Sequence, residues 1–393
     1  MSDGRELPRI FGGFKLAATV ALVVGTLALA LTASQSTEAF FRSYLFGYLF
    51  VLGFGLGSMG LLMLHHLVGG AWGFIIQRIL EAGVSTVPFL TVLFIPIVFG
   101  AGDLYHWMDA EAVAHDHLLS HKAPYLDFSF WVVRAAVYFV IWNAIAYQLV
   151  AWSKKQDRTG DGFLSNRMSA LSGPGMVLYF LTMTFASFDW AMSLEPHWFS
   201  TIYGLIFVED QALTAMAFAI IVLAYARRNE AVGDAATVER IHDLGKIQFA
   251  LVALWAYLNF SQFVIIWYAN LPEESVWYIR RIHGGYEFLA VFIIFGQFVL
   301  PFMLLLTRFT KRRMATLSSI AAFLIVMRLI DLYWFVMPTE HHPTLQLTWG
   351  DVGAPLGLFG AWFLVFVSMF GRRTLIVERD PRWMEKLAHE HAH

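Results

Sequence analysis

Residues 185–204 read FASFDWAMSLEPHWFSTIYG, and they join two long apolar segments of the chain. The first segment ends near Asp189, Pro196 lies between the two, and the second segment carries Glu209 and Asp210. A charged side chain costs at least a few kcal/mol in the hydrocarbon of a bilayer, so such residues normally face a protein interior. These acids therefore indicate buried polar chemistry inside a membrane protein.

The composition supports this interpretation. Apolar residues make up 58% of the sequence and charged residues 14%, against about 45–50% and about 25% in soluble domains. Together with recurring long apolar runs, this predicts an all-α polytopic membrane protein. Walker, Ser/His/Asp and nucleic-acid-binding patterns are absent, so we expect neither a soluble enzyme nor nucleic acid as a partner. The lack of cysteine excludes disulfides, thiolate-bound iron–sulfur clusters and covalently attached c-type haem in this chain.

The apolar segments predict ten spans, each long enough to cross about 30 Å of hydrocarbon at about 1.5 Å per residue. Their ranges are 10–33, 43–68, 82–102, 128–152, 170–193, 199–226, 244–268, 285–307, 316–337 and 351–371. Twenty-one lysines and arginines fall on the side of the two termini and four on the opposite side. Basic residues accumulate on the cytoplasmic side, so both termini, including the tail 372–393, are predicted to be cytoplasmic.

Ionisable residues inside the spans are candidates for a proton route. They are His65, His66, Glu81, Glu209, Asp210 and Asp189. Glu209 and Asp210 show no evident partner, and adjacent residues on a helix point about 100° apart, so they cannot both face one neighbour. The alternative is that these groups only hold helices together.

Two ion pairs are predicted as structural elements. Arg328 and Asp331 are three residues apart on one helix face and can contact each other directly. Arg134 and Asp189 lie at similar depth on consecutive antiparallel spans, which makes them a second candidate pair. A related pattern is that Asp189 precedes Pro196 by seven residues, just as Asp331 precedes Pro338. This spacing suggests that spans two to five (43–193) are duplicated as spans six to nine (199–337).

The histidines do not indicate a cofactor. His65 and His66 are the only histidines well inside a span, whereas a b-type haem needs histidines on facing helices. We interpret Glu340, His341 and His342 in an outer connection as solvated groups, and we expect no metal in this chain. Gly53 and Gly57 have the spacing that lets membrane helices pack closely.

Residues 187–204, SFDWAMSLEPHWFSTIYG, closely resemble the corresponding stretch of the ActF-type membrane subunit of bacterial alternative complex III. That complex is a quinol:electron-acceptor oxidoreductase, and its membrane subunits resemble the NrfD/PsrC family. The resemblance implies two four-helix bundles, spans two to five and six to nine, flanked by the first and last spans. It also implies the bacterial plasma membrane as location and three kinds of protein partner beside membrane lipids. These are the paralogous subunit ActC, an iron–sulfur subunit and multihaem cytochrome c subunits, which would hold the haems and clusters.

Two functions follow as hypotheses. The first is a cofactor-free integral subunit of this respiratory complex that supports assembly and offers a route for protons. A quinone contact would need a polar pair at an outer bundle end, for which Asp189, His197 and Glu287 are candidates. The second is a free-standing proton-coupled secondary transporter. Transporters often have helices broken at mid-membrane, and few Gly/Pro interruptions are expected here, which favours the first hypothesis.

Overall fold

The computed structural model describes residues 11–229, 232, 235–340, 342–371, 374–377 and 379–391. Across these residues the chain is helical, with one isolated bridge between Thr339 and His342 and no strand. Ten helices or helix groups in this part of the chain are long and apolar enough to cross a membrane. The protein is therefore an all-α polytopic membrane protein.

The ten spans have the following bounds. They are α2 (Gly12–Gln35), α3 (Thr37–Val68), α4 to α6 (Ala71–Val84, Val87–Leu93 and Ile95–Phe99), α10 (Phe128–Thr159), α11 with the turn η2 (Gly162–Trp190 and Met192–Leu194), α12 (Tyr203–Arg228), α13 (Val238–Ala269), α15, η4 and α16 (Tyr286–Ile293, Ile294–Val299 and Leu300–Leu306), α18 (Met314–Val336) and α19 (Trp349–Phe370). Shorter helices lie in the connections and in the tail. They are α7 (Ala101–Leu104), η1 (His106–Met108), α8 (Ala110–His115), α9 (His117–Lys122), α14 (Pro272–Arg281), α17 (Arg308–Arg312) and α20 (Pro381–His391).

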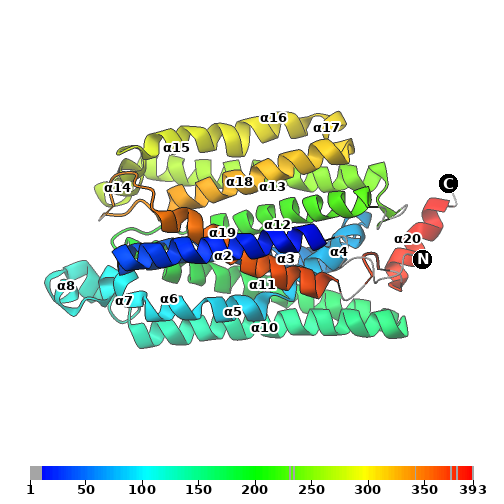
Figure 1. Cartoon of the computed structure of the whole chain (residues 1–393), viewed down its shortest axis with the longest axis horizontal. Coiled ribbons are helices and arrows are strands. Elements are labelled where there is room, and N and C mark those ends of the chain that lie inside the picture. The colour runs from blue at the N-terminus through cyan, green and yellow to red at the C-terminus, as the bar shows by residue number, and fades with distance from the viewer. Residues whose placement is uncertain are drawn as a thin grey trace.

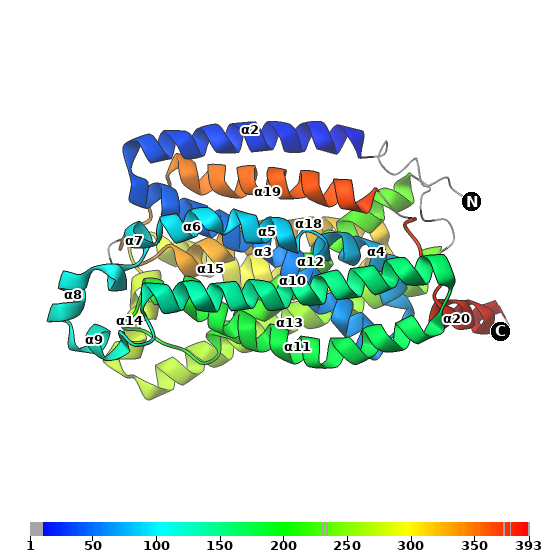
Figure 2. The ribbon, with the colours of Figure 1, turned by 90° about the horizontal axis from the view of Figure 1, so that it is seen from below.

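The eight spans from α3 to α18 comprise two successive sets of four, called the first bundle (α3 to α11) and the second bundle (α12 to α18). In the first, α3 packs against α4 and α11, and α10 packs against α11 and α5. In the second, α12 packs against α13 and α18, α13 against α16, and α15 against α18. The helices α3 and α12 contact each other along the centre of the molecule, and α2 and α19 form a pair that covers α3 from one side (Figures 1 and 2).

Small residues allow the central helices to approach closely. A Cβ atom on Gly57 of α3 would lie 1.9 Å from the backbone oxygen of Gln211 on α12, so only glycine fits there. This contact confirms the predicted close packing at Gly57, whereas a Cβ atom on Gly53 would lie 3.8 Å from Thr214, an ordinary contact distance. Between α2 and α19, a Cβ atom on Gly25 would lie 2.3 Å from the backbone nitrogen of Gly357. Both approaches bring backbone against backbone, which large side chains would prevent.

The two ends of the molecule differ. The helices α7, α8 and α9 extend from one end, while the beginning of α2 and the helix α20 lie at the other (Figures 1 and 2). Because the number of predicted spans is even, the beginning of the first span and the segment after the last span lie at the same end. The first ten residues and Arg372 and Arg373 of the tail, which contribute to the predicted orientation, lie outside the described residues.

The predicted third span, 82–102, is wrong at its beginning. The structure places this span at Ala71–Phe99, divided into α4, α5 and α6. Residues 71–81 lie outside the predicted range. They include two charged residues, Arg78 and Glu81, which the structure buries as an ion pair inside the span. Pro88 and Pro96 lie at the beginnings of α5 and α6, where a residue without an N–H interrupts the helix ladder.

The expectation of unbroken spans is also wrong for the eighth span. There the α-helix changes to a π-helix over Ile294–Val299, directly before Pro301. Proline cannot donate a backbone hydrogen bond, and the wider π-turn accommodates that loss. Two of the spans are therefore interrupted within the membrane region, and both interruptions accompany proline.

Candidate functional site

Three charged side chains meet inside the second bundle, between α12 and α18. Arg328 Nη1 lies 2.9 Å from Asp210 Oδ2 and 2.5 Å from Asp331 Oδ2, so one guanidinium is shared by two carboxylates. All three residues are at most 5% exposed. The Arg328–Asp331 contact agrees with the prediction from their spacing. The prediction that Asp210 lacks a partner is wrong, because Arg328 comes from a helix more than a hundred residues further along the chain.

Glu209 has the opposite environment. It is 3% exposed, and neither carboxylate oxygen has a hydrogen-bond partner among the described residues. Its neighbour Asp210 points to Arg328, and two consecutive helix positions diverge by about 100°, so the same guanidinium does not serve both acids. A buried carboxylate without a partner is costly, so a side chain in this place is expected to bind a proton.

An apolar pocket of about 710 Å³ lies beside this cluster. It is bounded by α13, α14, α18 and the interrupted span of α15, η4 and α16. Aromatic side chains form much of its wall, namely Trp255, Tyr257, Phe260, Phe263, Tyr278, Phe298, Phe302 and Trp334. The few polar side chains in the lining include Asp331 and Asn259. The pocket therefore offers a mostly apolar volume with the cluster's carboxylate at its edge, which is typical of small-molecule sites.

Sequence reasoning missed this pocket. Its wall depends on the π-helix, where Ile294 and Phe298 contribute side chains to the lining. Gln297 of the same segment is fully buried, and neither of its amide atoms has a hydrogen-bond partner among the described residues. π-Helical turns occur frequently at functional sites. The available signal in the sequence was Pro301 together with Gly296, five residues before it.

Arg134 and Asp189 form the main ion pair of the first bundle. Arg134 Nε donates to Asp189 Oδ2 at 2.9 Å and Nη2 to Oδ1 at 2.8 Å, a bidentate geometry. The hydroxyl of Tyr138 also donates to Asp189, at 2.8 Å. Asp189 is fully buried, and the Arg134 guanidinium lies 3.9 Å from the ring centre of Tyr125. With its hydrogen bonds made by neighbours, Asp189 has the environment of a structural group.

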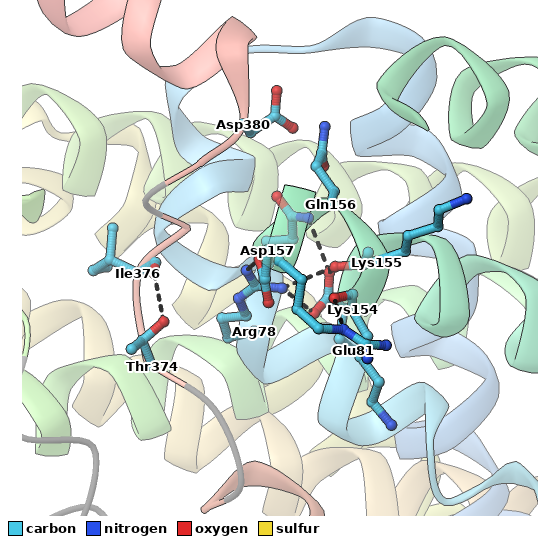
Figure 3. Close-up of polar contacts among 12 residues, drawn as sticks. Arg78, Glu81, Lys154, Lys155, Gln156, Asp157, Thr374, Ile376 and Asp380 are labelled. Atoms are coloured by element: carbon cyan, nitrogen blue, oxygen red, sulfur yellow. Dashed lines mark hydrogen bonds and ion pairs between the residues drawn. The ribbon is translucent and has the colours of Figure 1, made fainter. Parts of the chain in front are cut away.

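Glu81 belongs to a second closed network, near the end of the molecule that carries α20. Arg78 contacts Glu81 at 2.7 Å and also pairs with Asp157 of α10. Ser153 donates to Glu81 at 2.6 Å and accepts from Arg78 at 2.8 Å. Figure 3 shows this group with Asp157 between Arg78 and the lysines of α10, and with Thr374, Ile376 and Asp380 of the tail alongside. Glu81 thus has a guanidinium and a hydroxyl as hydrogen-bond donors, whereas Glu209 has no hydrogen-bond partner among the described residues.

His65 and His66 lie at the same end of the first bundle and are both buried. The His65 ring contacts Phe74 edge-on at 4.6 Å between ring centres, and Phe74 in turn packs at 5.2 Å against Trp383 of α20. Neither ring nitrogen of His66 has a hydrogen-bond partner among the described residues. The structure therefore places this pair under the C-terminal helix, apart from the cluster of Glu209 and Asp210.

The two remaining candidates for an outer quinone pocket are not brought together. His197 is part of a polar pocket of about 410 Å³, where its ring lies 2.6 Å from Asp116. Hydrogen bonds from the backbone N–H of Leu119 and from His197 hold the pKa of Asp116 below its ordinary value. Glu287 instead accepts a hydrogen bond from the backbone N–H of Gly285, at 2.8 Å, at the beginning of α15. His197 and Glu287 thus serve separate local structures.

Sequence reasoning also missed a buried arginine that links the two bundles. Arg281 of α14 is 1% exposed, and its Nη1 donates to Glu195 Oε2 at 3.0 Å. Its Nη2 donates to the carbonyl oxygens of Phe335 and Pro338 at 2.9 and 3.1 Å. Arg280 adds a contact to Glu195 at 2.6 Å. The turns that contain Pro196 and Pro338 are thus joined through one guanidinium.

Comparison with models of known protein families and with curated protein sequences gives no match. Within the described residues, no group of three or more His, Asp or Glu side chains has an arrangement that could hold a metal ion. His341, one of the histidines considered as a ligand, lies outside those residues.

Proposed function

We propose that this chain is a membrane subunit of a quinol:electron-acceptor oxidoreductase of the alternative complex III type, and that Glu209 takes part in proton transfer through it. The observation that carries the proton-transfer role is the buried Glu209 carboxyl group without a partner among the described residues. Support for the complex comes from the stretch 187–204 and from the ten spans. The haems and iron–sulfur clusters would reside in partner subunits, among them one resembling ActC.

The chemistry assigned to the cluster is acid–base exchange. Arg328 is shared between Asp210 and Asp331, so protonation of one carboxylate lets the guanidinium pair more closely with the other. Glu209, directly beside Asp210, has no such compensation and is the group that binds and releases the proton. Asp331 also borders the apolar pocket, whose aromatic wall suits the ring and chain of a lipid-soluble quinol. This pocket replaces Asp189, His197 and Glu287 as the candidate site of quinone contact.

The test uses the purified complex in lipid vesicles, with Glu209→Gln as the variant. Glutamine keeps the shape of the side chain and removes its proton. We expect unchanged assembly and quinol oxidation with at least tenfold less proton release or pumping, which corresponds to a loss of about 1.4 kcal/mol or more in the transfer step. The control is Glu273→Gln, the same change at an exposed acid of α14. Proton transfer at the native stoichiometry in the assembled Glu209→Gln complex would contradict the role of Glu209.

A free-standing proton-coupled transporter is the second candidate, and one observation favours it. The third and eighth spans are interrupted at mid-membrane, as the spans of many transporters are. Purification in a mild detergent separates the two functions. Co-elution with multihaem cytochrome and iron–sulfur subunits supports the complex. Elution of the folded chain alone, with proton-linked uptake into vesicles, would support the transporter.

A further inference from the structure

A lysine is buried where the eighth and ninth spans are joined, at the end of the second bundle. Lys311 of α17 is 8% exposed, because its aliphatic stem packs against α13. A Cβ atom on Gly245 would lie 2.8 Å from Cβ and Cγ of Lys311, so glycine at that position makes room for the lysine. Its ammonium group lies 5.0 Å from the ring centre of Phe249. The side chain is thus held in one place by its surroundings.

Two further cations, Lys246 and Arg308, lie near Lys311. Burial together with the nearby cations Lys246 and Arg308 lowers the pKa of Lys311. Lys246 has an acidic partner, Asp243, at 2.9 Å. Among the described residues, no carboxylate forms an ion pair with Lys311 or with Arg308. Holding a cation in partial burial beside two others is unfavourable unless an anion joins them.

The position of these residues indicates which anion is suitable. Lys311 follows the last residue of the eighth span, Leu306, by five positions, which places it at the depth of lipid headgroups. Large apolar side chains of the segment that leads to it are open to the surroundings, with Met303 58%, Leu306 56% and Phe309 57% exposed. A cationic pocket bordered by exposed apolar side chains suits a phosphate group that carries acyl chains.

We propose that Lys246, Arg308 and Lys311, here called the inner cation cluster, form a binding site for the phosphate of an anionic membrane lipid. Lys311 contacts the phosphate from within the protein, and Arg308 and Lys246 contact it from the surface. The acyl chains lie along Met303, Leu306 and Phe309. This site is independent of Glu209 and of the proposed function.

The experiment measures lipid retention by native mass spectrometry of the purified protein in detergent. The probes are phosphatidylglycerol and phosphatidylcholine, which share acyl chains and a phosphate but differ in net charge. We expect phosphatidylglycerol to bind more tightly, and Lys311→Gln to weaken it about fivefold, the usual effect of one cation near an anionic headgroup. Arg308→Gln, at an exposed position, should weaken it to a similar extent without affecting folding, whereas Lys311→Arg should retain binding.

The matched control is Lys155→Gln, which removes an exposed cation from α10 in the first bundle. It should bind phosphatidylglycerol as the native protein does. Equal affinity for the two lipids in the native protein, or unchanged affinity in both Lys311→Gln and Arg308→Gln, would overturn the proposal. Displacement of phosphatidylglycerol by an equal concentration of inorganic phosphate would assign the site to free phosphate and overturn the lipid assignment.

Discussion

The Arg134–Asp189 pair allows a quantitative test of how buried charges stabilise this fold. Replacing Arg134 by methionine leaves the Asp189 carboxylate fully buried with the Tyr138 hydroxyl as its remaining side-chain donor. Removing one partner of a buried ion pair costs about 3–5 kcal/mol. Asp189→Leu should cost less stability for two reasons. The Arg134 side chain is 10% exposed, and its guanidinium retains its contacts with the rings of Tyr125 and Phe130, whose centres lie 3.9 and 4.4 Å away.

The double replacement removes both charges at once. What remains is the Tyr138 hydroxyl without its acceptor and the Tyr125 carbonyl without its donor, each worth about 1 kcal/mol. The double variant should therefore lose about 2 kcal/mol in total, less than Arg134→Met alone. The coupling energy is the sum of the two single losses minus the loss of the double variant, so it should exceed about 1 kcal/mol even at the lower end of the Arg134→Met range. An ordinary hydrogen bond between membrane helices averages only about 0.6 kcal/mol, so the two cases are distinguishable.

The assay is reversible unfolding in sodium dodecyl sulfate titrations of the native protein, both single variants and the double variant. A double variant as unstable as Arg134→Met, or a coupling energy below about 1 kcal/mol, would refute the reasoning. Arg328 and Asp331 provide the comparison. Removing both still leaves Asp210 without its cation, so that double variant should show no recovery until Asp210→Asn is added.

Three further predictions concern packing and topology. Gly57→Val should separate α3 from α12, because a side chain at this position overlaps the Gln211 carbonyl. The amount of folded protein recovered on gel filtration should fall at least fivefold. A normal yield would argue against the close approach of the two helices. Trp383→Ala should release α20, since this 2%-exposed indole anchors it, and limited proteolysis of the tail should become faster; unchanged proteolysis would exclude this anchoring role. Lys155 and Ala114 are both exposed, and single cysteines at these positions should react with an impermeant thiol reagent from opposite sides of the membrane. Labelling of both cysteines from the same side would contradict the ten-span topology.

The labelling sites illustrate where sequence information reaches its limit. Ser153 lies in a basic, hydrophilic part of the sequence at the end of a predicted span, and it would be a natural choice for labelling. In the structure it is 2% exposed and bonded to Arg78 and Glu81. The predicted boundaries ended the fourth span at 152, whereas α10 continues to Thr159. Helix hydrogen bonds continue past the hydrocarbon, so hydropathy locates the apolar part of a helix but not its end.

The sequence alone determined the class of fold, the number of spans and the local pairs. Long apolar runs and the spacing of Arg328 and Asp331 are properties of consecutive residues, and a bilayer forces such runs to form helices because backbone groups have no water to bond. Tertiary structure decided everything that depends on distance between helices. It gave Asp210 a cation and left Glu209 without a described partner, which neighbouring positions in the sequence could not distinguish. It also formed the pocket beside Asp331 from the interrupted eighth span and three other helices, because a cavity is defined by where separate helices diverge.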